Sequence, residues 1–108
     1  MSDRELLELA AKAAGIDYWI VRFAPRKAPI EKLHTEIDGE TVEWNPLTDD
    51  GDALRLAVKL RLDITFGRFG IYAGKTLEDT CHRVPSYDRE ATRLAIVRAA
   101  AEIGRAMP

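Results

Sequence analysis

The sequence contains one cysteine, Cys81, and therefore no second thiol with which an internal disulfide could form. A disulfide framework is excluded, and a lone thiol is compatible with a reducing cytosol. No apolar run approaches the ~18 residues of a membrane-spanning helix, and the N-terminus lacks the basic-then-apolar pattern of a secretory signal. We therefore expect a chain that is neither secreted nor inserted in a membrane.

The common catalytic motifs are also lacking, since neither G-x-S-x-G nor H-E-x-x-H occurs. The segment Gly74–Thr76 matches the end of a phosphate-binding P-loop, but that motif needs a glycine where Phe69 stands. Cys81 and His82 would point to opposite faces of a strand. With His34 as the one other histidine, these side chains do not complete a tetrahedral zinc site. We expect no catalytic residue, no metal and no cofactor, and hence a protein that is not an enzyme.

Charge is unevenly distributed along the chain, although the formal net charge is only −2. Seven acidic residues and no basic residue lie between Glu36 and Asp52, whereas residues 22–32 hold four bases and one acid. From Ala53 onward there are ten bases and six acids. A surface polarised in this way steers association with charged partners, so the charged clusters are candidate interaction sites.

The length of 108 residues corresponds to one domain, residues 1–108. Ser2 and Glu5 form a capping box for a first helix that Gly15 would end. Tyr18–Phe23 has the composition of a strand. Asp38-Gly39 is a strong hairpin signal, and it would join strands at Leu33–Ile37 and Glu40–Trp44.

A second helix is predicted after Pro46, with Thr48 or Asp49 as its cap and its end near Leu60. Residues 62–66 alternate as in a half-buried strand, and the glycines that follow indicate a hairpin. Residues 80–84 are a weaker strand prediction. Ser86 or Asp88 caps a final helix that runs to about Arg105.

The periodicity also predicts which side chains these helices bury. In the first helix the buried face would be Leu6, Leu9, Ala10 and Ala13. In the second it would be Ala53, Leu54, Leu56, Ala57, Val58 and Leu60, and in the third Thr92, Ala95, Ile96, Ala99, Ile103 and Ala106.

The predicted order of elements is thus α-β-β-β-α-β-β-(β)-α. Tight hairpins imply an antiparallel sheet, here of about five or six strands, and three amphipathic helices must cover its apolar faces. We expect an α+β fold arranged as an α-β-α sandwich.

Three segments, Asp3–Gly15, Trp44–Leu60 and Ala91–Pro108, resemble a group of small, uncharacterised proteins of tailed phages and prophages with a phage α-β-α sandwich domain. The resemblance implies that fold, a phage or prophage origin and residence in the cytoplasm of a bacterial host. It implies no catalytic residue. Such proteins often have glycine just after the second helix, where this chain has Arg61, and the sequence leaves the geometry of that helix end open.

The acidic segment supplies the first set of candidate site residues. Asp49, Asp50 and Asp52 do not follow the spacing of a calcium loop, and their position fits the start of a helix, where carboxylates are favoured. The candidate partner-binding residues are Glu36, Asp38, Glu40, Glu43, Asp49 and Asp50. They would bind a host or phage protein, and the chain would act as a small non-enzymatic accessory protein.

The basic residues supply the alternative. Nucleic acid could bind to a set of bases on the 24–29 loop and the last helix, namely Arg26, Lys27, Arg89, Arg93 and Arg98. The negative net charge argues against this function, because phosphate contacts need clustered bases. Homodimerisation stays open, as does the role of Cys81.

Overall fold

The computed structural model describes residues 2–23, 30–74 and 82–108. Over these ranges three helices form: α1 (Asp3–Ala14), α2 (Asp50–Leu60) and α3 (Arg89–Ala106). Six strands accompany them: β1 (Trp19–Phe23), β2 (Ile30–Ile37), β3 (Glu40–Glu43), β4 (Asp63–Gly67), β5 (Gly70–Gly74) and β6 (His82–Val84). The predicted loop at 24–29 and the predicted strand residues Thr80 and Cys81 lie outside the described residues.

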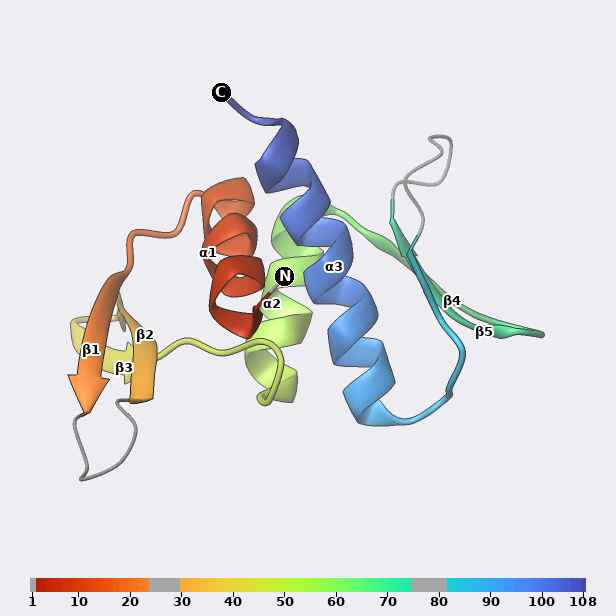
Figure 1. Ribbon diagram of the computed structural model, residues 1–108, viewed down its shortest axis with the longest axis horizontal. Coiled ribbons are helices and arrows are strands. Elements are labelled where there is room, and N and C mark those ends of the chain that lie inside the picture. The colour runs from red at the N-terminus through yellow and green to blue at the C-terminus, as the bar shows by residue number, and fades with distance from the viewer. Residues whose placement is uncertain (1, 24–29, 75–81) are drawn as a thin grey trace.

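The strands form two antiparallel sheets of three strands each, ordered β1-β2-β3 and β4-β5-β6. The predicted α+β class and antiparallel pairing are confirmed, but the six strands divide into two sheets instead of forming one. Figure 1 shows the three helices between the two sheets. In chain order α2 lies between the first three strands and the last three, and each strand pairs with its neighbour in sequence.

Each helix begins at the residue type that its sequence indicates. The backbone N–H of Glu5 donates to Ser2 Oγ at 3.2 Å, that of Asp52 to Asp49 Oδ2 at 2.8 Å, and that of Ala91 to Asp88 Oδ1 at 2.7 Å. These bonds satisfy backbone donors that the first helical turn leaves free. The capping predictions are confirmed, with Asp49 and Asp88 chosen over Thr48 and Ser86.

The helix ends are set by left-handed residues. Gly15 ends α1 at φ +66° as predicted, and Arg61 ends α2 at φ +53° with its N–H directed to the carbonyls of Ala57 and Val58. Arg61 therefore adopts the left-handed geometry for which glycine is the preferred residue. Because Arg61 has a Cβ atom, this conformation is sterically unfavourable.

The Asp38-Gly39 turn joins β2 and β3 as predicted, with positive φ at both residues (52° and 83°). This is the geometry that matches the twist of a hairpin. The register places Leu33 and Trp44 toward the helices, where both are buried, and leaves Glu36 and Glu43 exposed. On the face that Leu33 shares, Thr35 is also buried, whereas Ile37 beside the turn is 38% exposed.

The closest packing between elements joins α1 and α3. A Cβ added at Gly104 would overlap the carbonyl oxygen of Leu9, so α3 approaches the backbone of α1 directly. Lys12 Nζ also donates to the Met107 carbonyl at 3.0 Å, which ties the end of α3 to α1. Small side chains allow this approach, and Ala10 and Ala11 on α1 are fully buried.

The predicted buried faces of α1 and α3 need correction. On α1 the buried residues are Leu7, Ala10, Ala11 and Ala14, so the face is rotated from the predicted one. On α3 they are Ala91, Ala95, Ile96, Val97, Ala99, Ala100, Ala101 and Gly104, whereas Ala106 is exposed. Helix α3 contacts α1 and α2 on one side and β5 and β6 on the other, so most of its circumference is buried.

A polar contact fastens the first sheet to α1. The Tyr18 hydroxyl donates to Glu8 Oε1 at 3.0 Å. Burial raises the pKa of the Tyr18 phenol, and the bond to the Glu8 carboxylate raises it further.

Within residues 2–23, 30–74 and 82–108, none of the three helices has the length and apolar character of a membrane span.

Replacing Gly104 with alanine is expected to destabilise the protein by about 1–3 kcal/mol, because the new methyl group overlaps the backbone of α1. The free energy of unfolding, measured by denaturant titration, tests this. The control is Gly51→Ala in α2, where the three nearest atoms, at 3.2–3.3 Å, belong to the side chains of Arg55 and Asp49 and none to a backbone. That change should not reduce stability, and equal losses in both variants would contradict the proposed close packing.

Replacing Arg61 with glycine is expected to stabilise the protein by about 0.5–1 kcal/mol, since glycine adopts positive φ without a steric cost. The same denaturant titration measures the change. Lys59→Gly, one residue before the last position of α2, should lower stability by about 1 kcal/mol. A destabilised Arg61→Gly variant would show that the left-handed end is not strained.

Candidate functional site

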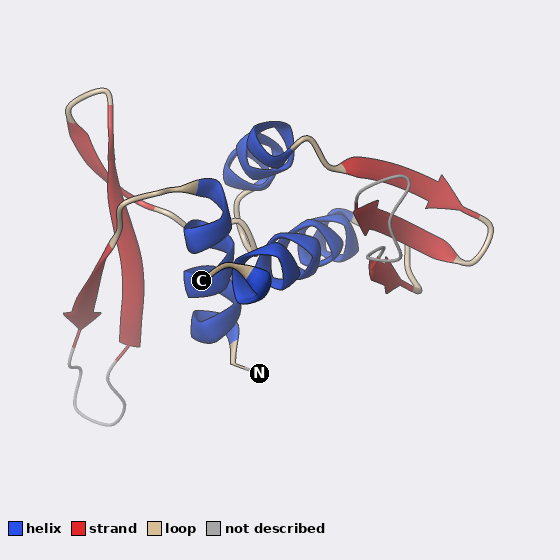
Figure 2. Ribbon diagram, turned by 90° about the horizontal axis from the view of Figure 1, so that it is seen from above, coloured by secondary structure: helices blue, strands red, loops and turns tan. Residues whose placement is uncertain are grey.

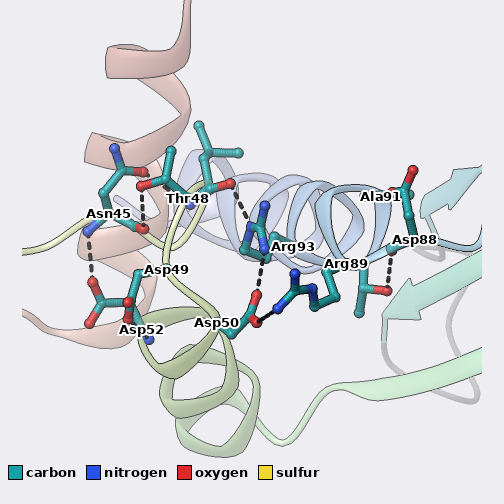
Figure 3. Close-up of polar contacts among 11 residues, drawn as sticks. Asn45, Thr48, Asp49, Asp50, Asp52, Asp88, Arg89, Ala91 and Arg93 are labelled. Carbon is teal, nitrogen blue, oxygen red and sulfur yellow. Dashed lines mark hydrogen bonds and ion pairs between the residues drawn. The ribbon is translucent and has the colours of Figure 1, made fainter.

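The start of α2 is anchored to the preceding loop by a buried carboxylate. Asp52 is only 4% exposed, and its Oδ2 accepts a hydrogen bond from the backbone N–H of Asn45 at 2.9 Å. Its Oδ1 accepts from Arg55 at 2.6 Å, the pair expected from their spacing of three residues. Figure 3 shows Asp52 turned toward Asn45 and away from α3. Asp52 therefore positions the loop that brings α2 beside the β2–β3 hairpin.

This anchoring creates an open groove of about 710 Å³ between the hairpin and the start of α2. The described residues that line it include five carboxylates, which we call the acidic groove: Asp38, Glu40, Glu43, Asp49 and Asp52. Four of the six predicted partner-binding residues thus lie together, although they come from two separate segments. Arg55 is the one base among the described lining residues.

Negative charge in the acidic groove is only partly compensated. Glu43 forms a salt bridge with Lys32 at 3.1 Å, and Arg55 lies 3.9 Å from Asp49 while it pairs with Asp52. In the described part of the chain, neither Asp38 nor Glu40 forms an ion pair, and both side chains are exposed. An excess of unpaired carboxylates on a concave surface attracts cations and basic segments.

Glu36 does not line the acidic groove. It lies at a neighbouring cavity of about 500 Å³ between the end of α1, β2 and α2, whose lining includes Trp19, Trp44 and Lys59. In the register Glu36 lies opposite Thr41, and its side chain is exposed.

Asp50 also lies apart from the acidic groove, because it faces α3 (Figure 3). Its carboxylate is 3.5 Å from Arg89 and accepts a hydrogen bond from Arg93. Arg93 Nε donates in addition to the Leu47 carbonyl at 2.8 Å. Asp50 and Arg93 thus connect the start of α2 to the start of α3.

The residues predicted to bind nucleic acid do not form one basic surface in the described part of the chain. Arg89 and Arg93 are brought together but already pair with Asp50, and Arg98 lies exposed farther along α3. Arg26 and Lys27 lie outside the described residues. Within residues 2–23, 30–74 and 82–108, no group of three or more His, Cys, Asp or Glu side chains is placed so that it could hold a metal ion.

An apolar surface on α2 is the feature that the sequence interpretation missed. Leu54 and Val58, predicted to be buried, are 61% and 68% exposed, so that part of the prediction is wrong. Leu54 lines a cleft of about 330 Å³ between α2, β4 and α3, which we call the apolar cleft and whose apolar walls include Ile64, Phe66, Tyr87 and Ile96. The signal in the sequence was the width of the α2 stripe, because six apolar residues in eleven exceed what one packing face can cover.

Comparison of the chain with protein-family models, with curated proteins and with solved structures found no match. The site must therefore be interpreted from its own geometry.

Replacing Asp52 with alanine is expected to lower stability by about 1–3 kcal/mol, because the Asn45 N–H and the Arg55 guanidinium lose their acceptor. Thermal and denaturant unfolding measure the change. The matched control is Glu36→Ala, which removes an exposed carboxylate and should alter stability by less than about 0.5 kcal/mol. A neutral Asp52→Ala variant would contradict the anchoring role.

Proposed function

We propose that this chain is a small non-enzymatic accessory protein of a phage or prophage, and that it binds a basic segment of a host or phage protein in the acidic groove. The resemblance of its helical segments to phage proteins motivates the proposed origin, and a phage protein of this kind would act in the cytoplasm of a bacterial host. The observation that carries the binding function is the meeting of carboxylates from two separate segments around one groove.

The shape and charge of the groove define the partner. Asp38 and Glu40 lie on the exposed hairpin and Asp49 on the start of α2, so an extended basic segment lying between them would meet carboxylates on both sides. Lys or Arg side chains form charge-assisted hydrogen bonds with such carboxylates. Since the groove is open, charge would contribute more to the association rate and specificity than to affinity.

The alternative function, nucleic-acid binding, would need Arg89 and Arg93 to leave Asp50 or to contact phosphate while paired with it. Binding by these bases would weaken steeply with salt, as counterion release requires. The same salt dependence holds for a basic peptide in the acidic groove, so nuclease sensitivity is the distinguishing observation.

The test compares the wild-type protein with the double variant Asp38→Lys/Glu40→Lys. Binding of a fluorescent oligolysine peptide, measured by anisotropy, should weaken at least about tenfold because two attractive charges become repulsive. Affinity capture from bacterial lysate with and without nuclease, followed by mass spectrometry, then identifies the natural partner. A nuclease-resistant protein that the double variant fails to retain would support the proposal.

Glu36→Lys is the matched control, since it reverses one exposed carboxylate of the same hairpin outside the acidic groove. It should retain most of the peptide binding. If Glu36→Lys and the double variant lose peptide binding equally, binding depends on the net charge of the protein and not on the acidic groove. Recovery of nuclease-sensitive material alone would favour the nucleic-acid alternative, with Arg98 as the first residue to change.

A further inference from the structure

Strand β4 has an unpaired edge on the side of the molecule opposite the first sheet. It pairs with β5 in an unbroken register from Asp63↔Gly74 to Gly67↔Gly70, with no bulge, and it is the outer strand of its sheet. Figure 2 shows no described element along its other edge. Within the described residues, the backbone N–H and C=O groups on that edge have no strand partner, so they can pair with another strand.

The other edge strands carry features that discourage pairing. Strand β1 carries an exposed charge, Arg22, on the same face as Ile20 and Leu33, and a charge on an edge strand opposes edge pairing. Strand β3 begins and ends with glutamate, and β6 has three residues. Strand β4 has a charge only at its first residue, Asp63, and contains neither lysine nor proline.

Large apolar side chains surround this free edge. Phe66 lies on β4 and Phe69 in the turn that follows it, whereas Leu54 and Tyr87 line the apolar cleft beside Phe66, and each of these side chains is more than half exposed. Together they expose on the order of 500 Å² per chain, so a pair of chains offers about 1,000 Å² of apolar surface, which is close to the size that a specific interface needs. Exposed apolar surface of this extent is typical of an interaction site.

We propose that β4 pairs antiparallel with β4 of a second copy of this chain, about a two-fold axis at Thr65, to form a continuous six-stranded sheet. In this register Ile64 of one copy lies opposite Phe66 of the other, on the face that borders the apolar cleft. Aromatic and β-branched residues opposite one another stabilise strand pairs. The exposed Phe66 is thereby covered next to Ile64 and Leu54 of the other copy.

The charges at the ends of β4 are complementary in this pairing. Asp63 lies opposite Gly67 of the other copy and next to its Arg68, so each end of the pair brings together one acid and one base. In the described residues Asp63 has no ion pair, and the contact shown for the Arg68 guanidinium is with the ring of Phe69. A two-fold axis makes the contact self-complementary and closed, so pairing stops at two copies.

The hairpin is held in place before association. The Tyr87 hydroxyl lies within hydrogen-bond distance of the carbonyl oxygens of Gly67 and Arg68, at 2.7 and 2.6 Å. Gly70 packs so closely on Val84 that a Cβ there would overlap the Val84 carbonyl. A preformed edge loses less conformational entropy on binding.

Sedimentation equilibrium and light scattering of the purified full chain test the proposal. The wild-type protein should show a mass near twice 12.1 kDa and a concentration-dependent dimer. Thr65→Lys and Thr65→Glu each place like charges opposite one another at the axis, and each should raise the dimer dissociation constant at least about tenfold. An equal mixture of the two variants should restore the dimer, because opposite charges then meet.

Thr41→Lys is the matched control, since Thr41 is an exposed threonine on β3, an edge strand of the other sheet. It should leave the dimer intact, and circular dichroism of all variants should match the wild type. A wild-type protein that stays monomeric at every concentration overturns the proposal. So does a dimer that Thr41→Lys weakens and Thr65→Lys does not, or a mixture of the Thr65 variants that stays monomeric.

Discussion

The direct contact between the backbone of α1 and Gly104 of α3 is the constraint on which the rest of the structure depends. Because small residues let the two helices approach closely, α3 lies in the centre of the molecule with most of its circumference covered. The first sheet then attaches on the α1 side, and β5 and β6 pack on the other side of α3 (Figure 1). The two sheets are separated as a result, and each keeps edge strands of its own.

Helix α2 is positioned by polar contacts at its start, and these contacts also decide which charges remain available. The Asp52 carboxylate accepts hydrogen bonds from the Asn45 N–H and from Arg55. The Asp50 carboxylate forms ion pairs with Arg89 and Arg93. The neighbouring Asp49 stays at the acidic groove, where it joins the hairpin residues. Asp49, Asp50 and Asp52 look equivalent in sequence but have three different roles. Neighbouring positions at the start of a helix point in different directions.

The two surfaces proposed for binding differ in their physical character. The acidic groove is polar, open and formed by segments that α2 brings together, whereas the β4 edge is apolar and offers unpaired backbone groups. They involve different residues, because the acidic groove lies between α2 and the β2–β3 hairpin and the apolar cleft lies between α2, β4 and α3. A dimer formed through β4 would therefore present two acidic grooves, and a partner with two basic segments would gain affinity from binding both.

Sequence by itself determined much of the local structure of this protein: the cap at Ser2, the Asp38-Gly39 turn, the end of α1 at Gly15 and the α+β order of elements. For the other two helices it narrowed the cap to Thr48 or Asp49 and to Ser86 or Asp88, of which the structure uses Asp49 and Asp88. These features depend on side chains bonding to backbone groups within a few residues. Tertiary structure decided the division into two sheets, the buried faces of α1 and α3, the exposure of Leu54 and Val58, and the pairing of Asp50 with α3. Periodicity shows that a helix has an apolar face, but the neighbouring elements determine how much of that face is covered.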